Sequence, residues 1–208
     1  MTRKAKIIIV IGAVIILLGF LLGFLLVLLA NHFPLFYTER GEIDGFRVHV
    51  NRVGNQCFVG RYTYDGENRE ITIPDEYDGV PITRIGGSSA INGPLNEFYV
   101  DMRDVYMNSE ESPYHTVYTE SVMDDEHIRD PYTIEEVPFV LHIGKNIRTV
   151  ERVDMDKYYP HVNEDGSITF YHAVFEIRCD EDNPYFYAKD GKLYGRKTDQ
   201  PVSEFHAE

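Results

Sequence analysis

The chain lacks the short motifs that mark the common enzyme classes. It contains no G-x-S-x-G nucleophile turn, no phosphate-binding loop, no dinucleotide fingerprint, and neither H-E-x-x-H nor C-x-x-C. Glu135 and Glu136 stand side by side, but no spacing singles out two carboxylates as an acid–base pair. The acidic blocks 124–126 and 180–182 do not match the calcium-binding loop. We therefore expect no catalysis, no metal and no cofactor.

Cysteine is also scarce, and positive charge is outnumbered. The 208 residues include 2 cysteines, 34 acidic and 20 basic residues, and the formal net charge is −14. Arg3, Lys4 and Lys6 carry +3, so the rest of the chain carries −17. That charge argues against nucleic acid and allows cationic partners. So few cysteines exclude a small disulfide scaffold, and the missing N-x-[ST] sequon is compatible with a bacterial surface protein.

One unbroken apolar run, Ile7–Ala30, contains no charged or hydrogen-bonding side chain. As a helix it spans roughly 36 Å, against about 30 Å for the core of a bilayer. Basic residues precede the run and none follows before Arg40, which predicts a cytoplasmic head at residues 1–6 and an extracellular segment at 31–208. A cleaved signal peptide is the alternative, but its apolar region is shorter, and Leu28 is unsuited to the −3 position of a cleavage site after Ala30. The pattern favours an uncleaved single-pass anchor in the cell membrane.

Small residues recur on one face of this predicted helix. Their spacings of seven, four and seven residues place them in a stripe, and the central pair forms a G-x-x-x-G. Such a stripe lets two helix backbones approach closely, which favours a homo-oligomer or a complex with another membrane protein. The simpler interpretation is that glycine is common in membrane helices. The candidate association residues are Gly12, Gly19, Gly23 and Ala30.

Beyond the anchor we predict a juxtamembrane spacer at 31–44 and a β domain at 45–208. Alternating apolar residues predict strands at 46–50, 58–64 and 70–73, joined by turns as a short antiparallel meander that caps the domain. Brief apolar segments follow, each ended by glycine, proline or asparagine, which is typical of stacked coils.

Three stretches carry a repeated pattern. The first is I-T-I-P at 71–74 with D-G-V-P-I-T-R-I-G at 78–86; the second is L-H-I-G-K-N-I at 141–147; the third pairs N-P-Y-F at 183–186 with D-G-K-L-Y at 190–194. Together they resemble the BspA-like leucine-rich repeats of bacterial surface proteins. The resemblance implies a mostly β, right-handed solenoid that is displayed at a cell surface and used for binding. The A-F segment usual after the I-G is missing, and residues 103–137 fit no repeat, so they are interpreted as an insertion.

Alternation along each predicted strand separates an inner from an outer face. We expect the inner face to hold Ile71, Ile73, Phe98, Val100, Phe139, Leu141, Ile143, Phe175, Ile177 and Cys179. We expect the outer face to hold Thr72, Tyr99, Asp101, Val140, His142, Glu176 and Arg178. Cys57 belongs to the meander and Cys179 to the last coil, so intervening strands hold them about 14 Å or more apart, too far for a disulfide. Both are predicted to be buried free thiols.

The sequence therefore supports three functional hypotheses. The first is a membrane-anchored extracellular binding or adhesion module for an unidentified protein or glycan. The second is a structural or regulatory subunit that associates through its glycine-striped helix, and the third is a surface hydrolase. Solenoids bind through exposed strand faces, and tyrosines in long loops supply contact area. The candidate binding residues are Tyr99, Asp101, His142, Glu176 and Arg178 on the outer face, with Tyr106, Tyr114 and Tyr118 in the insertion.

Overall fold

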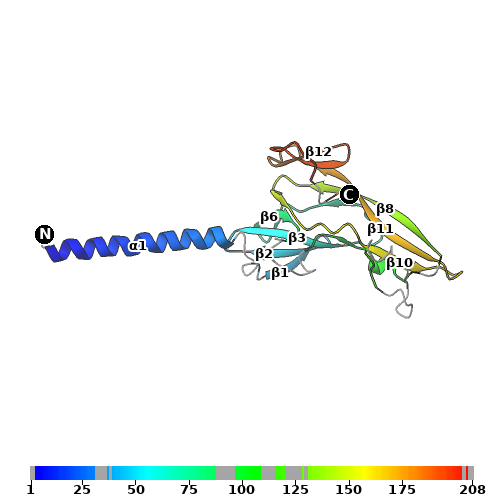
Figure 1. Cartoon of the computed structure of the whole chain (residues 1–208), viewed down its shortest axis with the longest axis horizontal. Coiled ribbons are helices and arrows are strands. Elements are labelled where there is room, and N and C mark those ends of the chain that lie inside the picture. Colours follow the sequence, from blue (N-terminus) through cyan, green and yellow to red (C-terminus); the bar gives the residue numbers. More distant parts are fainter. Residues whose placement is uncertain are drawn as a thin grey trace.

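The protein is mainly β, with one long helix at its amino end (Figure 1). The computed structural model describes residues 3–30, 37, 39–87, 97–108, 116–119, 128, 131–202 and 205. Among these described residues, the helices are α1 (Arg3–Ala30) and the single-turn α2 (Arg103–Tyr106). The strands form a seven-stranded sheet, a four-stranded sheet and a two-stranded hairpin. This agrees with the mainly β fold class predicted from sequence.

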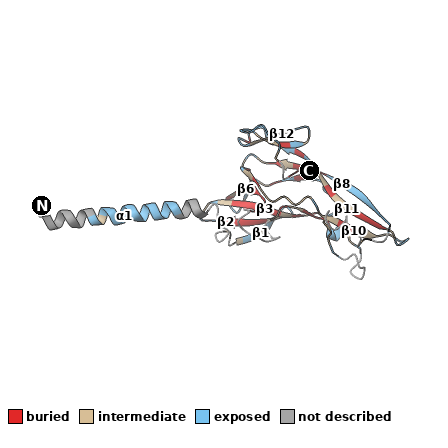
Figure 2. Cartoon of the chain, viewed as in Figure 1, coloured by how far each residue is buried: buried red, intermediate tan, exposed pale blue. Residues whose placement is uncertain are grey.

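Helix α1 covers the whole apolar run and projects from one end of the β region (Figure 1). Its side chains are described over residues 11–25 and are mostly exposed (Figure 2). Within the described residues, no helix is both long and apolar enough to cross a membrane.

The seven-stranded sheet begins as an antiparallel ribbon, continues with parallel pairs and ends with the antiparallel pair of β6 and β5. Its path is β1 (Glu39–Ile43), β2 (Phe46–Asn51), β3 (Gln56–Thr63), β6 (Val80–Ile85) and β5 (Glu76–Tyr77), while β7 (Val100–Asp101) pairs with β3 and β9 (Thr149–Val150) pairs with β6. Strand β1 lies within the segment predicted to be a spacer. It pairs with β2 through a two-residue turn, Asp44-Gly45, in which both residues have positive φ, as such hairpins require.

The four-stranded sheet has the order β10 (Tyr158–Val162), β11 (Ile168–Cys179), β8 (Tyr132–Ile143) and β4 (Glu70–Thr72). Strands β4, β8 and β11 are parallel, and β11 and β8 run side by side for twelve residues (Figure 1). Strand β8 thus begins inside the segment predicted to be an insertion. The hairpin of β12 (Phe186–Lys189) and β13 (Lys192–Gly195) follows β11.

The third strand of the predicted meander is misplaced in our sequence interpretation. Strands β2 and β3 do pair antiparallel, but β4 leaves them and pairs in parallel with β8 in the other sheet. The reason is burial: in this position Ile71 lies beside Leu141, and both side chains are almost fully buried. Removing such a side chain from water contributes about 1.5–3 kcal/mol. This gain outweighs the advantage of the smaller loop-closure cost of pairing β4 with β3 through a short turn.

One hydrophobic core joins the sheets, and the strands of the β region concentrate the buried residues (Figure 2). The expected inner-face residues Ile71, Ile73, Phe98, Val100, Phe139, Leu141, Ile143 and Ile177 are all buried. Phe175 and Cys179 are half-buried and pack against the same core. Both cysteines are free thiols, and only Cys57 is fully buried.

Candidate functional site

The parallel register of β4, β8 and β11 aligns residues from three distant segments on one face of the four-stranded sheet. Glu70, Val140 and Glu176 form one row across the strands. Thr72, His142 and Arg178 form the next row. Since side chains alternate along a strand, both rows project from the face opposite to the core. We call this surface the outer face.

Polar contacts tie the two rows together. Glu70 Oε1 accepts a hydrogen bond from His142 Nε2 at 2.8 Å and lies 3.3 Å from Arg178 Nη1. Arg178 Nε donates to Glu176 Oε1 at 3.2 Å. The side chains of Glu70, Glu176 and Arg178 are each more than half exposed. These ion pairs therefore orient the three side chains but contribute little to the stability of the fold.

An apolar groove of about 470 Å³ lies beside this network. Pro138, Val140 and Val174 supply outer-face side chains to it, and Glu70 and Glu176 stand at its borders. The remaining lining residues are Arg69, Phe139 and Phe175. The site therefore combines an apolar floor with two carboxylates and the side chain of Arg69.

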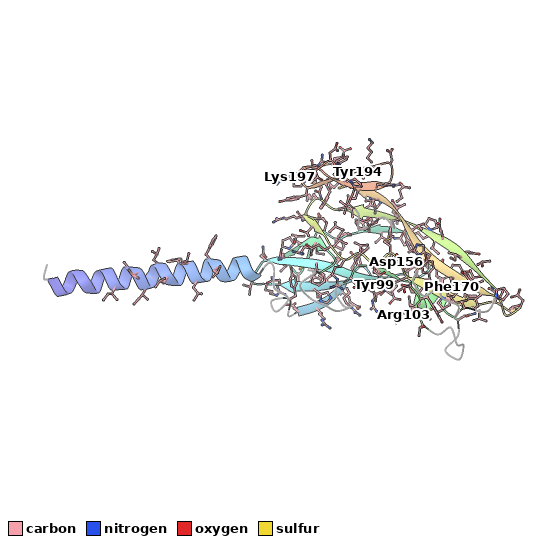
Figure 3. All side chains as sticks on the ribbon, viewed as in Figure 1. Tyr99, Arg103, Asp156, Phe170, Tyr194 and Lys197 are labelled. Carbon is pink, nitrogen blue, oxygen red and sulfur yellow. The ribbon has the colours of Figure 1, made fainter. Side chains whose placement is uncertain are left out.

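At its other end the outer face is covered. Ile168 and Phe170, on the same side of β11 as Val174, are buried in a second small cluster with Tyr118, Ile128 and Tyr158. The Tyr118 ring meets Phe170 edge-on, with centroids 5.4 Å apart. Figure 3 labels Phe170 on β11, well away from the β12–β13 hairpin that carries Tyr194. The described part of the insertion thus closes one end of the outer face and leaves the groove open.

Asp101 is not on the outer face, contrary to our prediction, but is buried with 5% of its surface exposed. Arg103 makes a bidentate contact to its carboxylate at 2.8 and 2.6 Å, and Arg61 Nη1 approaches at 3.3 Å. Burial alone would raise the pKa of Asp101. The hydrogen bonds and charge of Arg103, with the charge of Arg61, outweigh burial and lower it. These partners are what permits a carboxylate in the core, so its role is structural.

The remaining tyrosine candidates are dispersed. Tyr99 lies under Lys157, whose Nζ is 4.6 Å from the ring centroid, near Arg103 in the middle of the β region (Figure 3). Tyr106 stacks on Tyr171 with centroids 4.0 Å apart, on the core side of β11. Tyr118 covers Phe170, as described above. Tyr114 lies outside the described residues. The structure therefore brings His142, Glu176 and Arg178 together, whereas Tyr99, Tyr106 and Tyr118 pack against Lys157, Tyr171 and Phe170.

The glycine stripe of α1 is open to a neighbouring helix. A Cβ atom built on Gly12, Gly19 or Gly23 meets nothing within 4 Å. Gly19 and Gly23 form the floor of a shallow groove between Phe20 and Phe24. The side chain of Ala30 lies outside the described ones.

Sequence reasoning missed Glu70, Pro138 and Val174. A signal for Glu70 was present, because Glu70 precedes Ile71 just as Glu176 precedes Ile177 in a later repeat. Aligning the repeats would have placed it in the same row. Pro138 and Val174 lie outside the repeated pattern, and only the twelve-residue pairing of β8 with β11 brings them together.

Comparisons with known proteins add no identity. No protein-family model, curated protein or solved structure matches this chain. Among the described residues, no group of three or more histidine, cysteine, aspartate or glutamate side chains could hold a metal ion.

Proposed function

We propose that this protein is a membrane-anchored extracellular binding module, and that its outer face is the binding surface. One observation carries this proposal: the alignment of Glu70, Val140 and Glu176 in adjacent parallel strands beside an apolar groove. Rows of side chains on parallel strands are how repeat proteins build binding surfaces. The groove has the mixture of apolar floor and few polar groups that ligand sites have.

We further propose a short, leucine-rich-repeat-like solenoid as the scaffold. Supporting it, the repeated segments at 70–72, 140–142 and 176–178 occupy neighbouring strands in register. The segments that follow the first two repeats, β6 and β9, also pair in parallel in the other sheet. Such a two-sided succession is expected when each repeat forms one coil and stacks on the next.

We also propose that α1 is the membrane anchor, from its sequence and its helical structure together. The apolar run at 7–30 is helical within α1, and the basic head at 1–6 favours a cytoplasmic amino end. A second function, association with another membrane protein or with a second copy, is favoured by the open glycine stripe. In that case α1 is an interface as well as an anchor.

The binding function is tested with the full chain in phosphatidylcholine nanodiscs, probed on glycan and protein arrays. We expect at least one ligand whose signal is lost in Val174→Arg, which places a long cation in the groove. Val53→Arg is the matched control, because Val53 is an exposed valine in the β2–β3 turn. Equal signals for both variants, or no ligand at all, would overturn the proposal.

A further inference from the structure

We propose that the outer-face groove binds an extended cationic peptide segment in which an aliphatic side chain stands between two lysines or arginines. This inference rests on the proposed function, because it names the ligand class of the same site. It is carried by the geometry of two carboxylates about an apolar floor and by the charge of the domain.

The two carboxylates flank the floor symmetrically. Glu70 and Glu176 are the immediate neighbours of Val140 on either side, on β4 and β11. Neighbouring strands lie about 4.8 Å apart, so the two glutamate Cα atoms are about 10 Å apart. In the described part of the chain, the contacts of both carboxylates use Oε1. Oε2 of each is therefore available to a ligand cation.

The apolar floor accepts one aliphatic side chain. Val140 lies between the two glutamates, and Pro138 and Val174 form the next outer-face row toward the covered end of the sheet. In an extended peptide, residues i, i+2 and i+4 face the same way, and the outer two are about 13–14 Å apart. A central leucine can then rest on the floor while flexible lysine stems reach inward to Glu70 and Glu176. The pattern Lys-x-Leu-x-Lys fits this arrangement.

The charge of the domain favours a cationic peptide over an acidic one. The part of the chain after the basic head carries −17, so its field attracts cationic segments and repels acidic ones. Arg178 is already shared between the two glutamates and is half exposed. The second arginine at the groove, Arg69, donates hydrogen bonds to the hydroxyls of Tyr64 and Tyr106. Arg178 is therefore the internal cation with which the ligand competes for the two glutamates. Removing its charge should therefore strengthen binding of a cationic peptide, whereas removing the glutamate charges should weaken it.

The experiment measures binding of fluorescein-labelled Lys-Thr-Leu-Thr-Lys, amidated at its carboxyl end, to the full chain in phosphatidylcholine nanodiscs. Glu70→Gln with Glu176→Gln should weaken binding about tenfold, since two exposed ion pairs are lost. The matched control, Glu76→Gln with Glu164→Gln, removes the same charge from exposed positions elsewhere and should change binding less than twofold. Arg178→Gln should tighten binding severalfold. Replacing leucine by serine, or both lysines by glutamate, should abolish it.

Two results would overturn the inference. One is no binding by the native chain. The other is equal weakening in both double variants, which would show that binding depends on the net charge of the protein and not on Glu70 and Glu176. Tightening in Arg178→Gln guards against misfolding, because a damaged protein does not gain affinity. If the peptide fails while an array ligand is still lost in Val174→Arg, the inference is wrong and the proposed function stands. If no array ligand depends on Val174, the proposed function fails as well.

Discussion

Glu70 Oε1 lies 2.8 Å from His142 Nε2, although 72 positions separate the two residues. The contact exists because β4 pairs in parallel with β8. His142 is the pairing partner of Thr72, so it lies one outer-face row away from Glu70 on the neighbouring strand. It also places Glu70 at the border of the groove, within reach of Arg178. The outer face is thus assembled from β4, β8 and β11, which are distant in the sequence and are brought side by side by the strand pairing.

Replacing Asp101 should reveal a structural carboxylate. Asp101→Asn breaks the contacts to Arg103 and Arg61 and should cost about 1–3 kcal/mol of unfolding free energy at pH 7. The folded-state pKa of Asp101 lies below its unfolded value, so its stabilisation is complete above about pH 4 and is lost as the pH falls through the folded pKa. Urea unfolding at several pH values measures this. Asp104→Asn, at an exposed position in α2, should change stability by less than about 0.5 kcal/mol. A cost for Asp101→Asn that grows below pH 4 would contradict the assignment.

Gly86 should be intolerant of a side chain. It has φ +71°, and a Cβ there would stand 1.7 Å from the carbonyl oxygen of Glu151. Gly86→Ala should therefore cost about 2–4 kcal/mol through strain and displacement of the chain after β9. Gly79 has nearly the same φ, +72°, but open space around it, so Gly79→Ala should cost only about 1 kcal/mol. Chemical unfolding compares the two, and equal losses would show that the close approach at Gly86 is absent.

The two thiols should be slow to react in the folded protein. Burial raises the pKa of Cys57 to about 12 and that of Cys179 to about 11. At pH 8 little thiolate is present at either, and Cys179, the more exposed, should react first with an aromatic disulfide reagent. Unfolded, unreduced protein should titrate two thiols. A count of none would show that the cysteines are joined.

Bulk on the glycine stripe should reduce self-association if α1 is an interface. Gly19→Leu with Gly23→Leu fills the groove between Phe20 and Phe24. Leu17→Phe with Leu21→Phe adds bulk at the same spacing on a different face and is the control. Energy transfer between labelled chains in lipid vesicles measures the association. Equal energy transfer for both double variants would show that the glycine stripe does not lie in the interface.

Part of the fold could be predicted from sequence because its pattern is local. The triplets at 71–73, 141–143 and 177–179, each with apolar first and third residues, identify the buried residues Ile71, Leu141 and Ile177. Their period of two assigns His142 and Arg178 to the outer face. The destination of β4 could not be predicted, since alternation fixes which face of a strand is buried and not which strand lies beside it.

Asp101 was misplaced for a related reason. Alternation counts it with Tyr99 as an outer residue, but β7 is only two residues long, and Val100, Asp101 and Met102 are all buried. A carboxylate enters the core there because Arg61 on β3 and Arg103 on α2 converge on it. The sequence shows the proximity of Arg103 but gives no sign that Arg61 lies on the neighbouring strand. Likewise, Tyr132–Ile134 extends β8 only because β11 runs beside it.

The central claim is that ligands contact the outer face, and site-specific photo-crosslinking tests it most directly. A benzophenone side chain replaces Val174 in one protein and Val53 in another, and each full chain in nanodiscs is irradiated with the ligand found on the arrays. The account predicts a crosslink from position 174 that excess unlabelled ligand suppresses, and none from position 53. Crosslinking from position 53 without any from position 174 would contradict it.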